Sequence, residues 1–279
     1  MKITNFLALG ICLLFGSCTM QKSTVQVNDK GTEWEWNKGT IVVKTPERPA
    51  GQESVIGLAL PKMEVVRVGF VGLGMRGPGA VSRFTYIPGT QIVALCDYEK
   101  ERAEKCQKYL KEASLPKAAV YSGDKGYEEL CKRDDIDLVY IATPHSHHYL
   151  HAKMCLEAGK NVLCEKAFTV NADQARKLFA LAKEKNLLIT EAIWTRYMPS
   201  RKMIDDIISS GVIGEVTAVT ANLNYAISEV ERIRKPELAG GALLDVGVYT
   251  INFASMVLGD KQQILYGKGY IEDVLCGKT

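Results

Sequence analysis

The stretch from Val66 to Asp97 constrains the fold of this 279-residue chain more than any other part of it. It opens with an apolar run over 66–71, which favours a short buried strand. The next six residues, Gly72-Leu73-Gly74-Met75-Arg76-Gly77, carry the spacing G-x-G-x-x-G. A helix is predicted over 78–86 and a second strand over 91–95. The glycines therefore stand in the strand-turn-helix-strand context that gives such a motif its meaning.

This spacing predicts a dinucleotide-binding loop. The first glycine allows a tight turn, the second lets backbone N–H groups approach a pyrophosphate, and the third lets the helix pack closely on the sheet. The helix N-terminus adds free N–H groups and a positive dipole end. Asp97, 25 residues after Gly72, is predicted to accept hydrogen bonds from the adenosine ribose and so to favour NAD over NADP. Arg102 is close enough in sequence to leave NADP open.

The pattern up to residue 192 continues to alternate short apolar runs with helical stretches. Further strands are predicted at 118–121, 137–142, 161–164 and 187–190, with helices at 99–112, 124–132, 147–158 and 171–185. Such alternation implies right-handed crossovers and a mainly parallel sheet. The predicted fold class is therefore α/β, with a Rossmann-type doubly wound parallel sheet in an NAD(P)-binding domain over 63–192.

The pattern changes after this domain. A helix over 199–210, a strand over 215–225, a helix ending at Leu258 and a strand over 263–271 predict a smaller α+β substrate domain over 193–279. Two strands make a thin sheet, so we expect this domain to be incomplete at its C-terminus. Residues 19–62 are polar and irregular and predict a tether and an extended arm. We expect Trp34 and Trp36 to pin this arm to a globular surface, and a partner-binding role is the alternative.

The first eighteen residues resemble a bacterial lipoprotein signal. Lys2 precedes an apolar run over 3–15, and Gly16-Ser17-Cys18 follows, so that Cys18 would be lipidated and become the new N-terminus. The alternatives are an ordinary cleaved signal and a membrane anchor, and all three readings export the chain. We expect a protein anchored by lipid to the bacterial cell envelope, in the periplasm or at the outer membrane.

Charge and cysteine usage argue against a nucleic-acid partner, a disulfide framework and a zinc site. A net charge of +3 with scattered Lys and Arg gives no reason to expect a nucleic-acid partner. After processing, six cysteines remain at irregular spacing, at positions 96, 106, 131, 155, 164 and 276. Several lie in apolar contexts, so we interpret them as small buried hydrophobic residues and as neither a disulfide framework nor a zinc site.

Two further strand ends are predicted to meet the cofactor, because carboxyl ends of parallel strands face the ligand crevice. Thr143, Pro144 and His148 follow one strand, and Glu165 and Lys166 follow the next. All four histidines of the chain lie at 145–151, and His147 and His151 are one helical turn apart. No carboxylate lies among them, so we expect no metal site there. The alternatives are solvated histidines at a helix start and a histidine that touches cofactor or substrate.

A lysine at such a strand end can donate to a substrate hydroxyl or carbonyl, which makes Lys166 a catalytic candidate. Asp245 and Tyr249 are four residues apart and share a face if their segment is helical. A tyrosine and a lysine that converge on one hydroxyl can handle its proton during hydride transfer, with Asp245 orienting the substrate. Many helices contain such a pair for no catalytic reason, so the pair alone is weak support.

These motifs resemble those of the Gfo/Idh/MocA oxidoreductases. The likeness runs from Val66 to Gly259 and includes the glycine loop, Thr143-Pro144 with His148, 159–166, 191–197 and 240–249. It implies that Lys166 is the catalytic lysine and that Asp245 and Tyr249 lie in the substrate pocket, with Tyr249 as proton donor or acceptor. Ala167 stands where the family has proline. The chain also stops earlier than family members, as a fragment would, or a chain whose missing strands come from a partner.

A second resemblance covers Trp34 to Thr143, which is similar to the exported NAD-dependent α-N-acetylgalactosaminidases of the same superfamily. Those enzymes oxidise a sugar transiently, eliminate the glycoside, add water and reduce the sugar again. Around Glu165-Lys166-Ala167 the chain resembles the oxidoreductases instead, so it looks composite.

Export bears on mechanism, because nicotinamide cofactors are recycled in the cytoplasm. A tightly held cofactor, reduced and reoxidised within one cycle, is therefore expected. Our first hypothesis is an NAD(P)-dependent oxidoreductase that acts on a sugar or polyol hydroxyl. The alternatives are an NAD-dependent glycosidase and a sugar-binding lipoprotein without turnover. The expected partner is a small carbohydrate substrate, and we expect a homo-oligomer.

Overall fold

The computed structural model describes residues 25–27, 33–37, 40–43, 59–227 and 229–259. The chain divides into two compact units, and the described residues up to 43 belong to the first and those from 59 onward to the second. The predicted leader with Cys18, the predicted strand over 263–271 and Cys276 lie outside the described residues.

The first unit contains a three-stranded antiparallel sheet in the order β1-β2-β3. Its strands are β1 (Val25–Val27), β2 (Glu33–Asn37) and β3 (Thr40–Val43). In the β2–β3 register, Trp34 pairs with Val43 and Trp36 with Ile41. The described part of the predicted irregular arm is thus a sheet, and that expectation is corrected. The reason in the sequence is the alternation of polar and aromatic residues over 33–37, a period of two that favours a strand.

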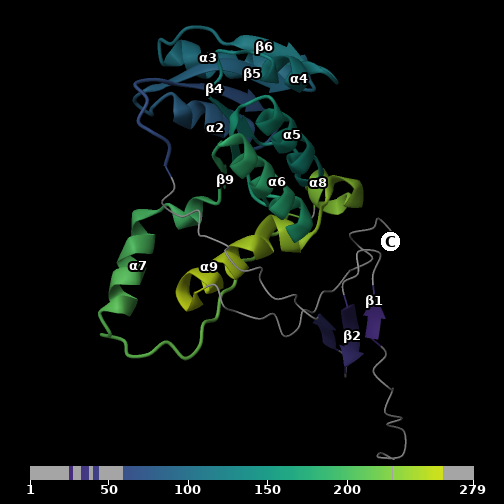
Figure 1. The fold of residues 1–279 in the computed structure, drawn as a ribbon, viewed down its shortest axis with the longest axis vertical. Coiled ribbons are helices and arrows are strands. Elements are labelled where there is room, and N and C mark those ends of the chain that lie inside the picture. Colours follow the sequence, from purple (N-terminus) through teal and green to yellow (C-terminus); the bar gives the residue numbers. More distant parts are fainter. Residues whose placement is uncertain (1–24, 28–32, 38–39, 44–58, 228, 260–279) are drawn as a thin grey trace, which may run out of the picture. The chain divides into compact units, whose positions relative to one another are not determined.

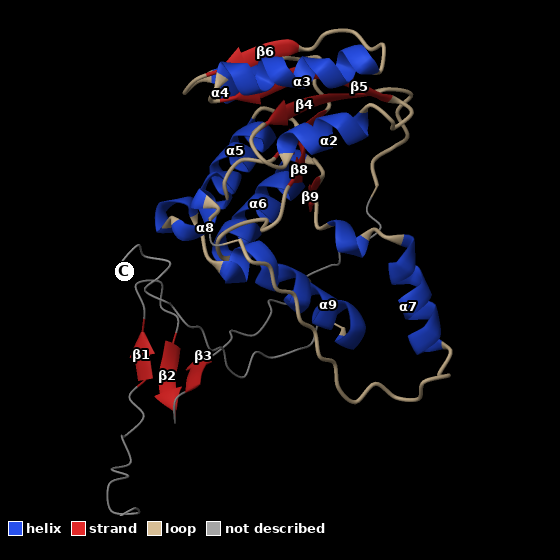
Figure 2. Cartoon of the chain, turned by 180° about the vertical axis from the view of Figure 1, so that it is seen from behind, coloured by secondary structure: helices blue, strands red, loops and turns tan. Residues whose placement is uncertain are grey.

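The second unit is built on a six-stranded sheet in the order β6-β5-β4-β7-β8-β9, with every pair parallel (Figures 1 and 2). Its strands are β4 (Val66–Val71), β5 (Thr90–Asp97), β6 (Ala119–Ser122), β7 (Leu138–Ile141), β8 (Asn161–Cys164) and β9 (Ile189–Glu191). The order reverses between β4 and β7, which makes their carboxyl ends the switch point where such sheets bind ligands. The predicted Rossmann-type doubly wound sheet is confirmed.

Five helices cover the two faces of this sheet: α2 (Gly77–Phe84), α3 (Lys100–Glu112), α4 (Gly126–Cys131), α5 (His145–Glu157) and α6 (Ala172–Lys185). One apolar cluster joins α2 and α3 to the sheet around Phe70, and the other joins α4, α5 and α6 to it around Ile141. Phe70 and Ile141 are both completely buried. Because both sheet faces are covered, the strands read as continuous apolar runs in the sequence.

Local signals fix the limits of α6. The side chain of Asn171 accepts a hydrogen bond from the Gln174 N–H at 3.0 Å, which satisfies one free donor of the first turn. Asn186 ends the helix in the left-handed conformation, with φ +53°, which asparagine adopts more readily than most residues. These signals hold the helix that supports β8 and β9.

Between β9 and Gly259 the described residues form six helical elements, which are η1 (Trp194–Arg196), α7 (Pro199–Ser209), α8 (Glu231–Arg234), η2 (Pro236–Leu238), a π-helical turn η3 (Leu243–Gly247) and α9 (Val248–Leu258). The strand predicted over 215–225 is wrong, because 216–227 contains neither helix nor strand. A strand needs a hydrogen-bonded neighbour, and no strand of the described residues pairs with this segment.

By length and composition, the described stretch Pro236–Leu258 is apolar enough to cross a membrane, with a mean hydropathy of 1.5 over its window. It also contains Asp245, which is 4% exposed and lies between two cationic side chains. We therefore interpret this stretch as a wall of the pocket described next.

Candidate active site

The glycine loop joins β4 to α2 and has two kinds of glycine. A Cβ on Gly72, whose φ is +92°, would lie 2.6 Å from the carbonyl carbon of Ala142, and one on Gly77 would lie 2.1 Å from the Gly72 oxygen. Both are fixed by the chain's own packing. A Cβ on Gly74 would meet nothing within 4 Å. The loop is therefore open on the Gly74 side, where a ligand can approach the backbone.

Asp97 ends β5 and ties the loop to the sheet. Its Oδ2 accepts a hydrogen bond from the Leu73 N–H at 2.6 Å, and its Oδ1 accepts one from the Glu99 N–H at 3.0 Å. Arg102 also reaches Oδ1, at 3.4 Å. The sequence predicts a ribose contact for this carboxylate, and the structure places it at the pocket edge with an additional task, that of holding the loop.

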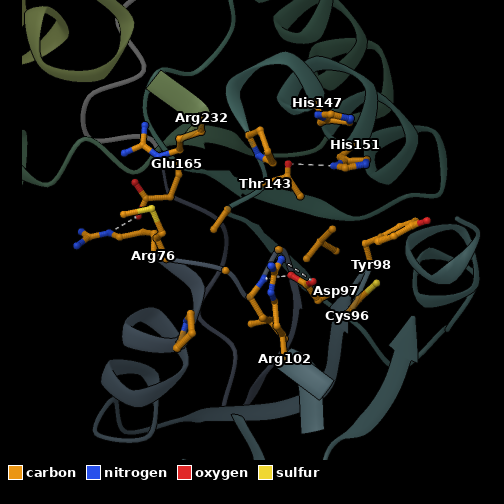
Figure 3. A pocket seen from close by; sticks show the side chains of 18 of the residues that line it. Arg76, Cys96, Asp97, Tyr98, Arg102, Thr143, His147, His151, Glu165 and Arg232 are labelled. Carbon is orange, nitrogen blue, oxygen red and sulfur yellow. Dashed lines mark hydrogen bonds and ion pairs between the residues drawn. The ribbon is translucent and has the colours of Figure 1, made fainter. Parts of the chain in front are cut away.

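One cavity of about 1070 Å³ runs along the carboxyl ends of the strands. Most of the predicted site residues line it, namely Gly72, Leu73, Gly74, Met75, Arg76, Asp97, Thr143, Pro144, Glu165, Lys166 and Tyr249. Asp97, Tyr98 and Arg102 lie at one end, and Glu165 and Arg232 lie at the other (Figure 3). Gly77, His148 and Asp245 do not line the cavity and support residues that do.

Lys166 and Asp245 meet across the two halves of the second unit. The lysine Nζ donates to the Asp245 carbonyl oxygen at 2.6 Å and to its Oδ1 at 2.9 Å. Arg232 of α8 donates to the same Oδ1 at 2.7 Å. Burial raises the pKa of the Asp245 carboxyl, but these two cations outweigh it, so the pKa lies below its usual range. Asp245 is therefore an anion that orients the lysine ammonium.

Tyr249 lies in the first turn of α9, beside Lys166. The lysine Nζ is 5.4 Å from the centre of the tyrosine ring. Trp194 Nε1 donates a hydrogen bond to the tyrosine oxygen at 3.2 Å, which leaves the hydroxyl hydrogen to be donated elsewhere. Burial raises the pKa of Tyr249, although this hydrogen bond lowers it in part. The tyrosine is thus a protonated donor at neutral pH.

Glu165 follows β8 and links the glycine loop to β7. Its Oε1 accepts hydrogen bonds from Arg76 Nε at 2.8 Å and from the hydroxyl of Tyr140 at 2.5 Å. The Arg76–Glu165 pair is visible at one end of the pocket (Figure 3). Arg76 belongs to the loop and Tyr140 to β7, so one buried carboxylate joins three neighbouring segments of the site.

The four histidines of α5 have different surroundings. His148 is completely buried, with Nδ1 2.7 Å from the Ala167 carbonyl oxygen and Nε2 2.8 Å from that of Thr143. Burial lowers its pKa to about 4, although both carbonyls favour the protonated ring. His148 therefore holds the Thr143 and Ala167 backbones together, next to the catalytic lysine candidate. Because His148 does not line the cavity, it would act on the cofactor only through these two residues, and not by the contact predicted for it.

The other three histidines line the cavity. His151 Nδ1 is 3.0 Å from the Thr143 hydroxyl. A dashed line marks this hydrogen bond in Figure 3. Burial lowers the pKa of His151 to about 4. Burial, more than the nearby Lys166 and Arg232, also lowers the pKa of His145. Within the described ranges no group of three or more His, Cys, Asp or Glu side chains could hold a metal ion.

Sequence reasoning missed Arg232 and Trp194, which contact Asp245 and Tyr249. Arg232 lies in a polar connection with no motif around it, so no pattern of spacing could have found it. Trp194 lies in the segment 191–197, which resembles the Gfo/Idh/MocA family. It follows a strand end, and this position could have predicted a place in the site.

Family comparison decides what this geometry belongs to. Residues 66–192 match the model described as "Oxidoreductase family, NAD-binding Rossmann fold", and residues 202–272 match the "GFO/IDH/MocA C-terminal domain". The chain belongs to the Gfo/Idh/MocA family. The glycine loop, Lys166 and Asp245 therefore lie in the two parts that define this family, and the predicted family is confirmed.

Curated relatives of this family carry glycosidase names. The chain is 58% identical over 217 residues to "Glycosyl hydrolase family 109 protein 4" of Phocaeicola vulgatus and 56% identical over 218 residues to protein 5 of that organism. The two matches cover 77% and 76% of this chain but 42% of each relative. The chain thus spans less than half the length of these relatives.

A solved structure is similar as well. KijD10, a 3-ketoreductase from Actinomadura kijaniata in complex with NADP and TDP-benzene, matches with a TM-score of 0.60 and 30% identity. The match covers 70% of this chain and 58% of that one.

Proposed function

We propose that this chain is an NAD(P)-dependent oxidoreductase that acts on a sugar or polyol hydroxyl and holds its cofactor tightly. One observation carries the proposal: Lys166 lines the same cavity as an open glycine loop and is held by the buried Asp245, with 2.9 Å between Nζ and Oδ1. The loop supplies a place for a dinucleotide, and the pair supplies a group that binds a reacting oxygen.

The residues present fit a dinucleotide. Gly74 leaves its backbone open, and the first turn of α2 has no side-chain cap, so its N–H groups are available to a pyrophosphate. A nicotinamide cofactor would supply the hydride acceptor or donor. Asp97 favours NAD, because a carboxylate repels a 2′-phosphate, whereas Arg102 keeps NADP open.

Lys166 and Tyr249 would handle the proton. The lysine has three N–H donors, and its two contacts with Asp245 leave one for the substrate oxygen. In carbonyl reduction, the Tyr249 hydroxyl gives its proton to the substrate oxygen while the Lys166 ammonium stabilises the negative charge that develops there. In alcohol oxidation the same groups take the proton back. Asp245 and Arg232 act as positioning residues.

A glycosidase activity is the second candidate. It is favoured by the names of the relatives above and by the resemblance of the N-terminal half to NAD-dependent α-N-acetylgalactosaminidases. The same lysine and tyrosine would serve the transient oxidation, and the cofactor would return to its starting state in each turnover.

Two substrates separate these activities. The purified full chain is incubated with free sugars and polyols, and then with an aryl α-N-acetylgalactosaminide, while nicotinamide absorbance and aryl alcohol are measured. Absorbance change with free sugars alone supports the oxidoreductase, and release of aryl alcohol supports the glycosidase. Neither signal, in a protein that binds NAD, would contradict both and favour a binding protein.

We further propose export, lipid attachment at Cys18 and a homo-oligomer. The leader pattern supports the first two, and a cofactor that is not exchanged would suit such a location. Fractionation of cells that produce the full chain and its Cys18→Ser variant tests the anchor, which predicts membrane association for the first alone. Light scattering of the purified protein tests the oligomer, and a monomer mass would contradict it.

A further inference from the structure

Two thiols lie in contact beneath the pocket wall. Cys131 is the last residue of α4, Cys155 lies in α5, and their sulfur atoms are 3.1 Å apart. Both side chains are buried, with exposures of 3% and 1%. A disulfide requires about 2.05 Å, so the sulfur atoms need to approach by roughly 1 Å. The pair joins positions 24 residues apart in the sequence.

The other described cysteines have no such partner. Cys96 and Cys164 belong to the same apolar cluster, and Cys106 belongs to the cluster on the opposite face of the sheet. Among the five described cysteines, the Cys131–Cys155 pair makes the one thiol–thiol contact. The geometry therefore selects a single pairing.

We propose that Cys131 and Cys155 form a disulfide when the protein meets a disulfide oxidant, and that this bond locks α4 to α5. Sequence analysis interpreted both residues as buried hydrophobic side chains, and the contact between helices adds this chemical role. The predicted export would bring the pair into an oxidising compartment, where such bonds persist.

The reaction balances with a low-molecular-weight disulfide as oxidant. The Cys131 thiolate attacks one oxidant sulfur, forms a mixed disulfide and releases one thiol. Cys155 then loses its proton, attacks the Cys131 sulfur and releases the second thiol, so two protein thiols are oxidised and one disulfide is reduced to two thiols. The Cys155 hydrogen bond lowers the pKa of Cys131, which makes Cys131 the attacking group. Access requires local opening of α4, a helix of six residues.

The bond would stiffen one wall of the cavity. Tyr127 of α4 and His151 of α5 both line it, and their ring centres are 4.4 Å apart. Cys131 and Cys155 lie four residues after these two, one turn along the same helices. A covalent link there would hold the tyrosine against the histidine. It would also close a loop in the unfolded chain, which lowers the entropy of the unfolded state and raises the melting temperature.

Peptide mapping tests the pairing directly. The folded full chain is incubated with oxidised glutathione, quenched in acid, alkylated in denaturant without reduction and digested with trypsin. The tryptic peptides Gly126–Lys132 and Met154–Lys160 contain one cysteine each. We expect them as one linked species that separates on reduction, whereas Cys106 is alkylated. Complete alkylation of Cys131 and Cys155, or a link from either to Cys96 or Cys164, would overturn the proposal.

Variants separate the bond from general effects of oxidation. The melting temperature of the wild type should rise by several degrees with oxidant and return with dithiothreitol. Cys106→Ser should behave in the same way, and Cys131→Ser should show no rise. An equal rise in Cys131→Ser would refute the lock. If that variant does not fold, the peptide map of the wild-type protein still decides the pairing.

Discussion

Different kinds of contact stabilise two regions of the second unit, residues 66–192 and residues 193–259. In the first region whole side chains such as Phe70 and Ile141 are completely buried between sheet and helices. In the second region the buried described residues are Ile193, Asp245 and Asn252, and two of these are polar. The first region thus owes its shape to apolar packing, which is non-directional, and the second is fixed to it by directed polar contacts.

These directed contacts are few and specific. Lys166 donates to Asp245 across the two regions. Within the second region, Arg196 donates to the Asn252 side chain and Arg201 donates to the Met256 carbonyl oxygen at 2.6 Å. The comparison teaches that substitutions in the first region should act on folding or cofactor binding, and substitutions at the polar contacts should act on turnover.

The strongest way to break this comparison is Lys166→Ala. Loss of the group that binds the reacting oxygen should lower kcat by on the order of 10³, because general acid–base and charge-stabilising groups contribute at that level. The NAD affinity, measured by calorimetry, should stay within about threefold, since backbone groups of the loop dominate it. The exposed Lys153→Ala is the control. Unchanged turnover would contradict the catalytic assignment.

A glycine pair separates folding from cofactor binding within the first region. Gly77→Ala puts a Cβ 2.1 Å from the Gly72 oxygen and should cost several degrees of melting temperature or abolish folding. Gly74→Ala meets no atom within 4 Å, so its melting temperature should be that of the wild type while NAD binding weakens by about tenfold or more. Equal destabilisation by both substitutions would remove the distinction between them.

Tyr249→Phe tests the polar contacts of the second region. It removes the proton donor and keeps the ring, so kcat should fall by roughly 10- to 100-fold with NAD binding unchanged. The exposed Tyr197→Phe removes a hydroxyl on a neighbouring segment and serves as the control. Equal turnover of Tyr249→Phe and wild type would leave the lysine as the proton-transfer group.

Acid should act on the first region, because all four histidines lie there. The folded pKa of His148 and His151 is about 4, below the unfolded value of 6.5, so the unfolded state binds more protons as pH falls. Their stabilisation is present above pH 6.5 and is lost as pH falls toward 4. Between pH 6.5 and 5.5 the free energy of unfolding should drop by about 1 kcal/mol for each histidine.

Urea titrations at the two pH values measure this drop. His151→Asn should lessen it, because this substitution removes one of the two rings whose pKa burial lowers to about 4. An unfolding free energy that is the same at both pH values would show that folding does not lower the pKa of these rings.

The smallest effect is expected at Asp97. Asp97→Asn removes the negative charge and should shift the ratio of NADP to NAD affinity by about tenfold toward NADP. Arg102→Gln should shift it the other way if the guanidinium meets the 2′-phosphate. A ratio that neither substitution changes would exclude both residues from cofactor discrimination.

The two regions also differed in how much their sequence revealed. The strands of the first region were predicted to within about three residues at their ends, because each combines an apolar run with a turn signal. The glycine loop and Lys166 were predicted from such strand ends, whereas Tyr249 of the second region was predicted from its spacing to Asp245 and from the family resemblance. All three line one cavity. Local patterns carry this information, since a parallel sheet buried on both faces leaves little choice of residue.

The second region shows what local patterns cannot carry. The β-branched and aromatic residues over 215–225 suggested a strand, but such propensity becomes a strand only beside a partner. Arg232 meets Asp245 through a connection that has no sequence signature, and Asp245 holds Lys166 where a substrate contact was predicted. Contacts between positions 79 residues apart depend on the tertiary arrangement.

The most direct test of the account is the nucleotide content of the protein. The purified full chain is denatured, and any released small molecule is identified and quantified by mass spectrometry, with Gly74→Ala treated in the same way. The account predicts about one NAD or NADP per wild-type chain and much less from the variant. A wild-type chain that releases no nucleotide and takes up no added NAD would contradict it.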